Sequence, residues 1–463
     1  MYSQEISVNS VQALVSVALD YSDTVKKIDA VSQQADIPVK NALADYDAVI
    51  KASVLFKRDD LDTNLPLPDS PVSEQMYSAS ISKPFSSGTA LSLGISHSRS
   101  PVEMYGITPN RITSVSLSIS QELLKNSFGL IQKANIDMSG ISSAIKRLLA
   151  NDALEEFIYD LENAYFSWEY LSQARKFYSQ LLKQTEWLEG VYKQKLSLGT
   201  AESPDMLYVS AAVLSRRLSL MEIEHRLLVS EIVLESLSGV DLDLSEKESS
   251  LSLDDDINMS LGFYQDKALE NRRDYAVLSM SIEQLALKMK IDENSFLPSL
   301  KLNASIIQNS ADDSIGDTFN GLFRDGNEFS IGLNLSMPLE RKKEYAAMEE
   351  DMLKMEELTS QATALEDKIK ADVESQYLLI SSLKKRLELA QKAVVLQEKR
   401  LEGENKRITQ GRSNADLLLR AQVDLLNARL AVLNIDLAYK QAVAKLYKLC
   451  AMTLPKYNIS EDK

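Results

Sequence analysis

The sequence predicts a mainly helical fold with a smaller β part, in which long antiparallel helical hairpins join about four strands per chain. Two long segments, residues 110–203 and 339–454, contain no proline, and apolar residues recur within them every three or four positions. Shorter segments ahead of each alternate apolar and polar residues, as strands with one apolar face do. These patterns occur in the same order twice, which indicates an internal two-fold repeat.

The composition excludes several classes of site. The chain has 463 residues with 51 Lys and Arg against 67 Asp and Glu, and its formal net charge is −16. An acidic chain lacks the basic face that a nucleic-acid binder needs. Cys450 is the single cysteine, and the two histidines, His97 and His225, have no metal-ligand spacing. We therefore expect no nucleic-acid partner, no metal site, no cofactor and no catalytic residues.

The first residues and the hydropathy of the chain limit where the protein is expected to be located. No run of 18 apolar residues occurs, so we expect no transmembrane helix. The first residues lack the basic and apolar regions of a signal peptide. The chain is therefore expected to be either cytoplasmic or a mature form from which the signal peptide was removed.

The first predicted repeat covers residues 8–250. Its expected elements are an N-terminal helix (8–44), strands at 46–57 and 112–120, a helix at 123–198, a turn at 198–205 and a helix at 204–237. A glycine that ends one helix and a polar cluster that starts the next make the turn of a helical hairpin.

The second predicted repeat covers residues 251–452, and residues 453–463 form a C-terminal tail. Its expected elements are a helix at 261–294, strands at 298–308 and 328–337, a helix at 339–410, a turn at 410–416 and a helix at 416–452. The last helix is short, and the N-terminal helix is expected to complete this half.

The two longest predicted helices set the dimensions. At 76 and 72 residues they measure about 114 Å and about 108 Å. A compact globule of this chain length has a radius of gyration of about 23 Å. Helices of this length do not fit in such a globule, so the sequence predicts an elongated protein.

Two further alternating runs flank Ser87 and Gly88, which favour a hairpin turn. The sequence leaves open whether this hairpin, residues 76–97, lies in the same sheet and raises the count to six strands, or projects outside it.

The chain resembles the TolC-type outer-membrane efflux protein family. Three segments carry the resemblance: residues 296–302, which open a strand, residues 329–339, which lead into a helix, and the turn and helix of residues 411–427. The resemblance implies a homotrimer with a joint transmembrane β-barrel and an α-helical tunnel. It also implies a bacterial outer-membrane location extending into the periplasm, and partnership with a periplasmic adaptor protein and an inner-membrane transporter.

Membrane physics favours the same interpretation. Strands exposed to lipid must close into a barrel because every backbone polar group needs a partner there. Four strands cannot close alone, but three copies supply about 12, an acceptable barrel. The alternative, a soluble sheet with one buried face, alternates identically but gives no reason for such long helices.

The two hairpin turns contain the candidate site residues. The predicted tip or constriction residues are Glu202, Asp205, Asp416 and Arg420. The predicted adaptor-contact residues are Gly199, Thr200, Gly411 and Arg412. A trimeric ring of carboxylates would select cations.

Two features depart from the family pattern. Arg420 replaces the acidic residue that the family often has, and we expect it to pair with a nearby carboxylate. Glu122 occupies a position where the family often has proline, which would soften the joint between strand and helix. Helix N-capping is the alternative role for Asp205 and Asp416.

The sequence thus predicts a passive export duct of an efflux or type I secretion system rather than an enzyme. No phosphate loop, nucleophile elbow or metal cluster is present in the sequence. The alternatives are a soluble coiled-coil scaffold and a general diffusion porin, which lacks such helices. The substrate, the particular adaptor and transporter, cation selectivity and the open or closed state are not readable from the sequence.

Overall fold

The computed structural model describes residues 6–59, 72–99, 111–244, 259–312, 314–321, 326–410 and 412–459. The chain divides into two compact units. The helical unit comprises residues 1–33, 147–277 and 362–463, and the sheet unit comprises residues 34–146 and 278–361.

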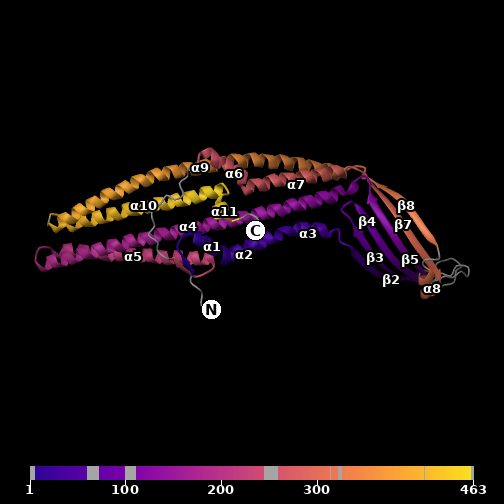
Figure 1. The fold of residues 1–463 in the computed structure, drawn as a ribbon, viewed down its shortest axis with the longest axis horizontal. Helices are drawn as coiled ribbons and strands as arrows, with labels where there is room; N and C mark the ends of the chain where they lie inside the picture. The colour runs from indigo at the N-terminus through magenta and orange to yellow at the C-terminus, as the bar shows by residue number, and fades with distance from the viewer. Residues whose placement is uncertain are drawn as a thin grey trace. The chain divides into compact units, whose positions relative to one another are not determined.

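The helical unit contains mostly α-helices. They are α1 (Val11–Tyr21), α2 (Asp23–Gln33), most of α4 (Leu130–Ser197), α5 (Ser203–Ser238), α6 (Leu261–Asn271), the start of α7 (Arg273–Ser295), most of α9 (Lys342–Thr409), α10 (Ala415–Leu449) and α11 (Thr453–Lys456). Strands β1 (Ile6–Val8) and β6 (Leu242–Leu244) form a small parallel sheet. In Figure 1, α4 runs beside α5 and α9 runs beside α10, as predicted for two helical hairpins.

The two long helices are confirmed, with shorter bounds than predicted. Helices α4 and α9 have 68 residues each, which corresponds to about 102 Å. Helix α4 begins at Leu130 rather than at residue 123 because the backbone N–H groups of Leu123 and Lys125 still bond to carbonyls of the neighbouring strand segment. Phe128, with a left-handed φ of +49°, then interrupts the helical conformation just before α4 begins.

The predicted N-terminal helix of residues 8–44 is wrong as a single helix. It is interrupted at Ser22, whose ψ of 130° is extended, and at a 3-10 turn, η1 (Gln34–Asp36), ahead of α3 (Ile37–Ala44). The predicted helix of residues 261–294 is interrupted in the same way at Arg272, whose ψ is 121°. Both breaks follow an 11-residue helix that a serine caps, Ser10 in one case and Ser260 in the other.

Three apolar clusters hold the helical unit together. The first joins α1, α4, α5 and α11, the second joins α6, α9 and α10, and the third lies at the ends of the two hairpins. Residues 453–459 of the predicted tail are part of this packing: Leu454 is fully buried, and the buried Glu162 carboxylate accepts hydrogen bonds from Lys456 and Tyr457.

The sheet unit contains one antiparallel sheet in its described residues, in the order β2-β3-β4-β5-β7-β8 (Figure 1). The strands are β2 (Val49–Asp59), β3 (Val72–Pro84), β4 (Thr89–Arg99), β5 (Arg111–Glu122), β7 (Ser299–Asp312) and β8 (Asn327–Ser336). Helix α8 (Ile315–Gly321) packs on β5 and β7.

The expectation of about four strands is therefore wrong, because the described sheet has six. The hairpin whose place the sequence left open supplies β3 and β4. It turns where predicted: the N–H of Phe85 donates to the carbonyl of Thr89 at 2.8 Å, and Gly88 has φ +74°. The remaining strands match the predicted four within a few residues at each end.

The register separates the two faces of the sheet. One row of directly paired residues crosses all six strands and is wholly apolar: Ile50, Ile81, Leu93, Leu117, Ile306 and Phe329. We call it the apolar row. A row one position along, on the other face, crosses five strands with serine alone: Ser82, Ser92, Ser118, Ser305 and Ser330. We call it the serine row.

The apolar row is exposed along its whole length, from 41% at Ile81 to 75% at Ile50. An isolated soluble domain buries such a face, so this surface requires a cover of lipid or protein.

Glu122 lies inside β5 rather than after it. Its carboxylate pairs with Lys301 at 3.3 Å and accepts a hydrogen bond from Ser299 at 3.2 Å. These contacts within the sheet therefore hold this end of β5. No helix within the described part of the chain is both long and apolar enough to cross a membrane.

Candidate functional site: the helical hairpin turns

The turn between α4 and α5 is closed by a left-handed glycine. Gly199 has φ +68°, and the N–H of Thr200 donates to the carbonyl of Lys195 at 2.9 Å. The Thr200 hydroxyl donates to the same carbonyl at 3.0 Å. This six-to-one bond with a glycine before it is the Schellman ending of a helix. Both predicted adaptor-contact residues of this turn, Gly199 and Thr200, are exposed.

The acidic residues of this turn are also exposed. Glu202 is the N-cap residue of α5, although its carboxylate makes no capping hydrogen bond in the described part of the chain. Asp205 lies two residues inside the helix, so its alternative role as N-cap is wrong. Its charge instead faces solvent in the first turn, where it interacts favourably with the helix dipole.

The turn between α9 and α10 shares a backbone hydrogen bond with the first turn. The N–H of Arg412 donates to the carbonyl of Arg407 at 2.8 Å, the counterpart of the bond from Thr200. Arg412 is exposed, and Gly411 lies outside the described residues. Ser413 donates to the Glu404 carboxylate at 2.7 Å, and this hydrogen bond lowers the pKa of Glu404.

Asn414, rather than Asp416, caps α10: its side chain accepts from the N–H of Leu417 at 3.0 Å. The alternative role of Asp416 as N-cap is therefore wrong as well. One oxygen of Asp416 instead accepts from Arg420 and from the Tyr208 hydroxyl, both at 3.0 Å. The structure thus pairs Arg420 with a carboxylate, as expected, and identifies that carboxylate as Asp416.

Tyr208 is the residue of this site that the sequence did not indicate. It lies on α5, is half-exposed, and joins the first hairpin to the second through Asp416. The hydrogen bond to a carboxylate raises the pKa of Tyr208. A lone tyrosine early in a helix carries no distinguishing pattern, so only the packing of the two hairpins reveals it.

Apolar packing holds the two turns side by side. The third cluster combines Leu188 and Tyr192 of α4 and Val209 of α5 with residues of α9 and α10 such as Ile408 and Leu418. The polar residues of both turns therefore stand on a shared apolar base. Any movement of one turn relative to the other has to break these contacts.

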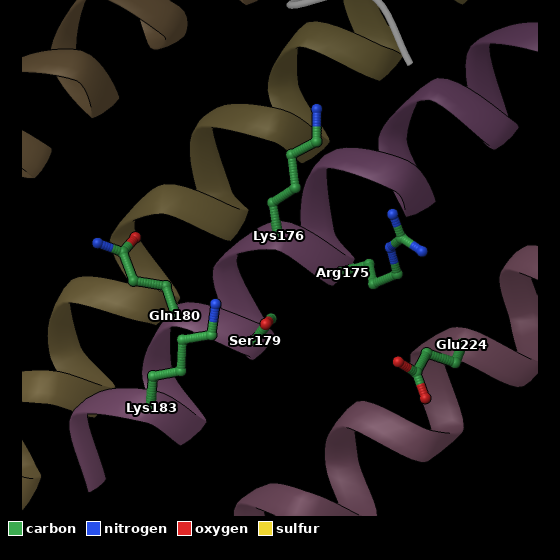
Figure 2. A pocket seen from close by; sticks show the side chains of 6 residues that line it. All are labelled: Arg175, Lys176, Ser179, Gln180, Lys183 and Glu224. Carbon is green, nitrogen blue, oxygen red and sulfur yellow. The ribbon is translucent and has the colours of Figure 1, made fainter. Parts of the chain in front are cut away.

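A separate pocket of about 400 Å³ lies on α4 and α5 and is open to solvent. Figure 2 shows Arg175 reaching from α4 toward α5, which carries Glu224, while Lys176 and Lys183 project elsewhere from α4. The pocket offers cations and one carboxylate on a helical surface, an arrangement typical of solvated charge. No group of three potential metal ligands occurs among the described residues.

Comparisons with known proteins bear on this architecture. The family model described as "Outer membrane efflux protein" matches residues 265–451. No curated protein sequence matches this chain. Among solved structures, VceC of Vibrio cholerae is 15% identical, with 95% of each chain covered and a TM-score of 0.70.

Two further solved channels have the same degree of likeness. CmeC of Campylobacter jejuni is 14% identical, with 98% of this chain and 87% of that chain covered and a TM-score of 0.70. MtrE of Neisseria gonorrhoeae, in its open state, is 16% identical, with 96% and 89% covered and a TM-score of 0.70. Likeness at such low identity shows a shared fold. Together with the family match over residues 265–451, it confirms the predicted resemblance to the TolC-type outer membrane efflux protein family.

Proposed function

We propose that the protein is the outer-membrane channel of a tripartite efflux or type I secretion system. It is a passive duct that carries substrates across the periplasm and the outer membrane, and it catalyses no reaction. The observation that carries this proposal is the sheet, whose apolar row is exposed on one face while its serine row lies on the other. A strand set with these two faces suits a barrel wall between lipid and water.

Closure of the wall requires a homotrimer. Within the described residues the sheet ends at β2 on one side and β8 on the other, so each chain presents two free strand edges. In lipid an unpaired edge is prohibitive, because each unsatisfied backbone group costs several kcal/mol. Pairing of β2 of one copy with β8 of the next satisfies both edges and closes a ring.

The two hairpin turns form the proposed periplasmic tip. Gly199, Thr200, Gly411 and Arg412 contact the periplasmic adaptor protein, and an inner-membrane transporter supplies the energy. Glu202 and Asp205 remain exposed carboxylates that line the constriction, whereas the charge of Asp416 is balanced by Arg420. Opening of the duct separates the two hairpins at this end.

The test compares two substitutions at neighbouring positions on β7. Ile306→Lys puts a charge in the apolar row, where a lipid-facing lysine costs about 2–4 kcal/mol, and we expect loss of membrane-assembled trimer. Ser305→Lys puts the same charge in the serine row, and trimers should persist. The measurement is outer-membrane fractionation followed by electrophoresis of unheated samples.

A coiled-coil scaffold makes the opposite prediction. It would remain in the aqueous fraction without detergent, and neither lysine would change its location. A further test locks neighbouring tips with engineered disulfides, which should stop export while the trimer stays intact. Unimpaired export through locked tips would contradict the proposed gate.

A further inference from the structure

Strands β3 and β4 lie within the sheet, between β2 and β5, which are two of the four strands that the sequence predicts for the barrel wall. β3 is paired with β2 from Val49 to Asp59, and β4 is paired with β5 from Thr89 to Arg99. Their 13 and 11 residues match the 12 of β5. A tilted strand of about 9–11 residues spans a bilayer, so both are long enough to do so.

The hairpin also continues both faces of the sheet. Ile81 and Leu93 belong to the apolar row and are 41% and 48% exposed. Ser82 and Ser92 belong to the serine row, and the Ser92 hydroxyl lies 2.5 Å from that of Ser118 on β5. The apolar row therefore runs from β2 to β8, and the serine row runs from β3 to β8, without interruption.

A hairpin that projected out of the wall would leave β2 and β5 to pair with each other. In the structure neither does: β2 pairs with β3, and β5 pairs with β4 and β7. Taking the two middle strands out of the sheet would break the β2–β3 and β4–β5 ladders and require a new pairing of β2 with β5.

We propose that β3 and β4 are wall strands, so that three copies of the six-stranded sheet close an eighteen-stranded barrel. The inference rests on the proposed outer-membrane channel and extends it to the width and lining of the pore. With strands about 4.8 Å apart and tilted about 40°, eighteen strands enclose a backbone diameter of about 36 Å, against about 24 Å for twelve.

The wider barrel determines what the membrane section admits. Allowing about 5 Å for inward side chains on each side leaves a clear width of about 26 Å, against about 14 Å for twelve strands. Three serine rows line it with neutral hydroxyl groups. The membrane section thus passes bulky hydrophilic cargo such as an extended polypeptide, and size selection falls to another part of the duct.

The test places a nitroxide on single cysteines in full-length trimers reconstituted in liposomes. Ile81→Cys and Leu93→Cys lie in the apolar row, and Ser82→Cys and Ser92→Cys lie in the serine row. We expect the first two labels to collide more often with lipid-dissolved oxygen than with a water-soluble nickel chelate. The serine-row labels should show the reverse preference. The unsubstituted chain is the labelling blank, because Cys450 is fully buried.

Ile306→Cys and Ser305→Cys on β7 are the matched controls, since β7 belongs to the wall with or without the hairpin. If the controls alternate while all four hairpin labels prefer the nickel chelate, β3 and β4 lie outside the wall and the inference is overturned. If Ile306→Cys also prefers the chelate, the sheet is not in lipid and the proposed function fails with it. Alternation at all six positions establishes the six-stranded wall.

Discussion

The Tyr208 hydroxyl on α5 donates a hydrogen bond to Oδ1 of Asp416 on α10 at 3.0 Å, and so joins the starts of the two returning helices. Because the acceptor is charged but the site is exposed, we expect the bond to contribute about 1 kcal/mol. Tyr208→Phe removes it without changing the ring. On the proposed gating, the open population of the tip should then rise about fivefold, measured as conductance of the reconstituted protein in planar bilayers.

The control for this experiment is Tyr21→Phe, which removes the hydroxyl of a half-exposed tyrosine at the end of α1. Its conductance should equal that of the unsubstituted channel. Equal conductance of Tyr208→Phe would mean that the hydrogen bond to Asp416 does not hold the tip closed.

Two consecutive glutamates on α4 differ sharply in environment. The buried Glu155 carboxylate pairs with Arg273 and accepts from the N–H of Thr453 at 2.7 Å, whereas Glu156 pairs with Lys448 at the surface. Glu155→Ala leaves a buried guanidinium without this partner, and we expect a loss of about 3–5 kcal/mol. Glu156→Ala should cost at most about 1 kcal/mol.

Circular dichroism during thermal unfolding of the purified variants checks this difference. The melting temperature should fall clearly for Glu155→Ala and little for Glu156→Ala. Similar shifts for the two variants would show that the buried pair does not anchor the C-terminal segment.

The glycines Gly199 and Gly190 provide a second matched pair. Gly199 has φ +68°, a conformation that an L side chain adopts at a cost of about 1–2 kcal/mol, although a Cβ there would meet nothing within 4 Å. Gly190 lies inside α4 with equally open surroundings. Gly199→Ala should therefore destabilise the protein, while Gly190→Ala should stabilise it by about 0.5–1 kcal/mol. Urea unfolding followed by circular dichroism distinguishes the two, and shifts of the same sign would contradict the left-handed turn.

The buried Asp351 carboxylate on α9 pairs with Lys288 on α7. Burial raises the pKa of Asp351 even though the hydrogen bond from Lys288 lowers it. The folded protein thus holds this proton at a higher pH than the unfolded chain does. Ionisation of Asp351 therefore lowers the free energy of unfolding as the pH rises through the pKa that this carboxyl has in the folded protein.

Lys288→Met removes the partner and should increase that cost, to about 3 kcal/mol at neutral pH. At a pH near the ordinary aspartate pKa of about 4, the carboxyl is protonated and most of the loss should disappear. Thermal unfolding at the two pH values measures it, and adding Asp351→Asn to Lys288→Met should restore stability at neutral pH. A loss independent of pH would show that Lys288 acts by packing instead.

Local chemistry explains which elements could be predicted. The absence of proline and the three-or-four spacing located α4 and α9, and Ser87 with Gly88 located the turn between β3 and β4. The breaks at Ser22 and Arg272 could not be predicted, because neither residue is a helix breaker by its own conformational preference. At Ser22 the break coincides with a tertiary contact: Gly239 lies so close that an added Cβ would be 2.8 Å from the carbonyl oxygen of Tyr21.

The same distinction applies to the candidate site. Gly199 and the polar cluster after it predicted a turn, because a left-handed backbone conformation and the start of a helix both depend on residues that are neighbours in sequence. Which residue caps α5 and α10 was not predictable, since sequence patterns leave a helix end uncertain by one or two residues.

The spacing of apolar residues by itself predicted long helices alternating with strands that have one apolar and one polar face. This is because the spacing reflects the backbone geometry of each element, three or four residues for a helix and two for a strand. Which partners those elements choose was decided by tertiary structure. The sequence left open whether β3 and β4 lie in the sheet, and nothing in it links Tyr208 to Asp416, which lie far apart along the chain and meet only through the packing of the two hairpins.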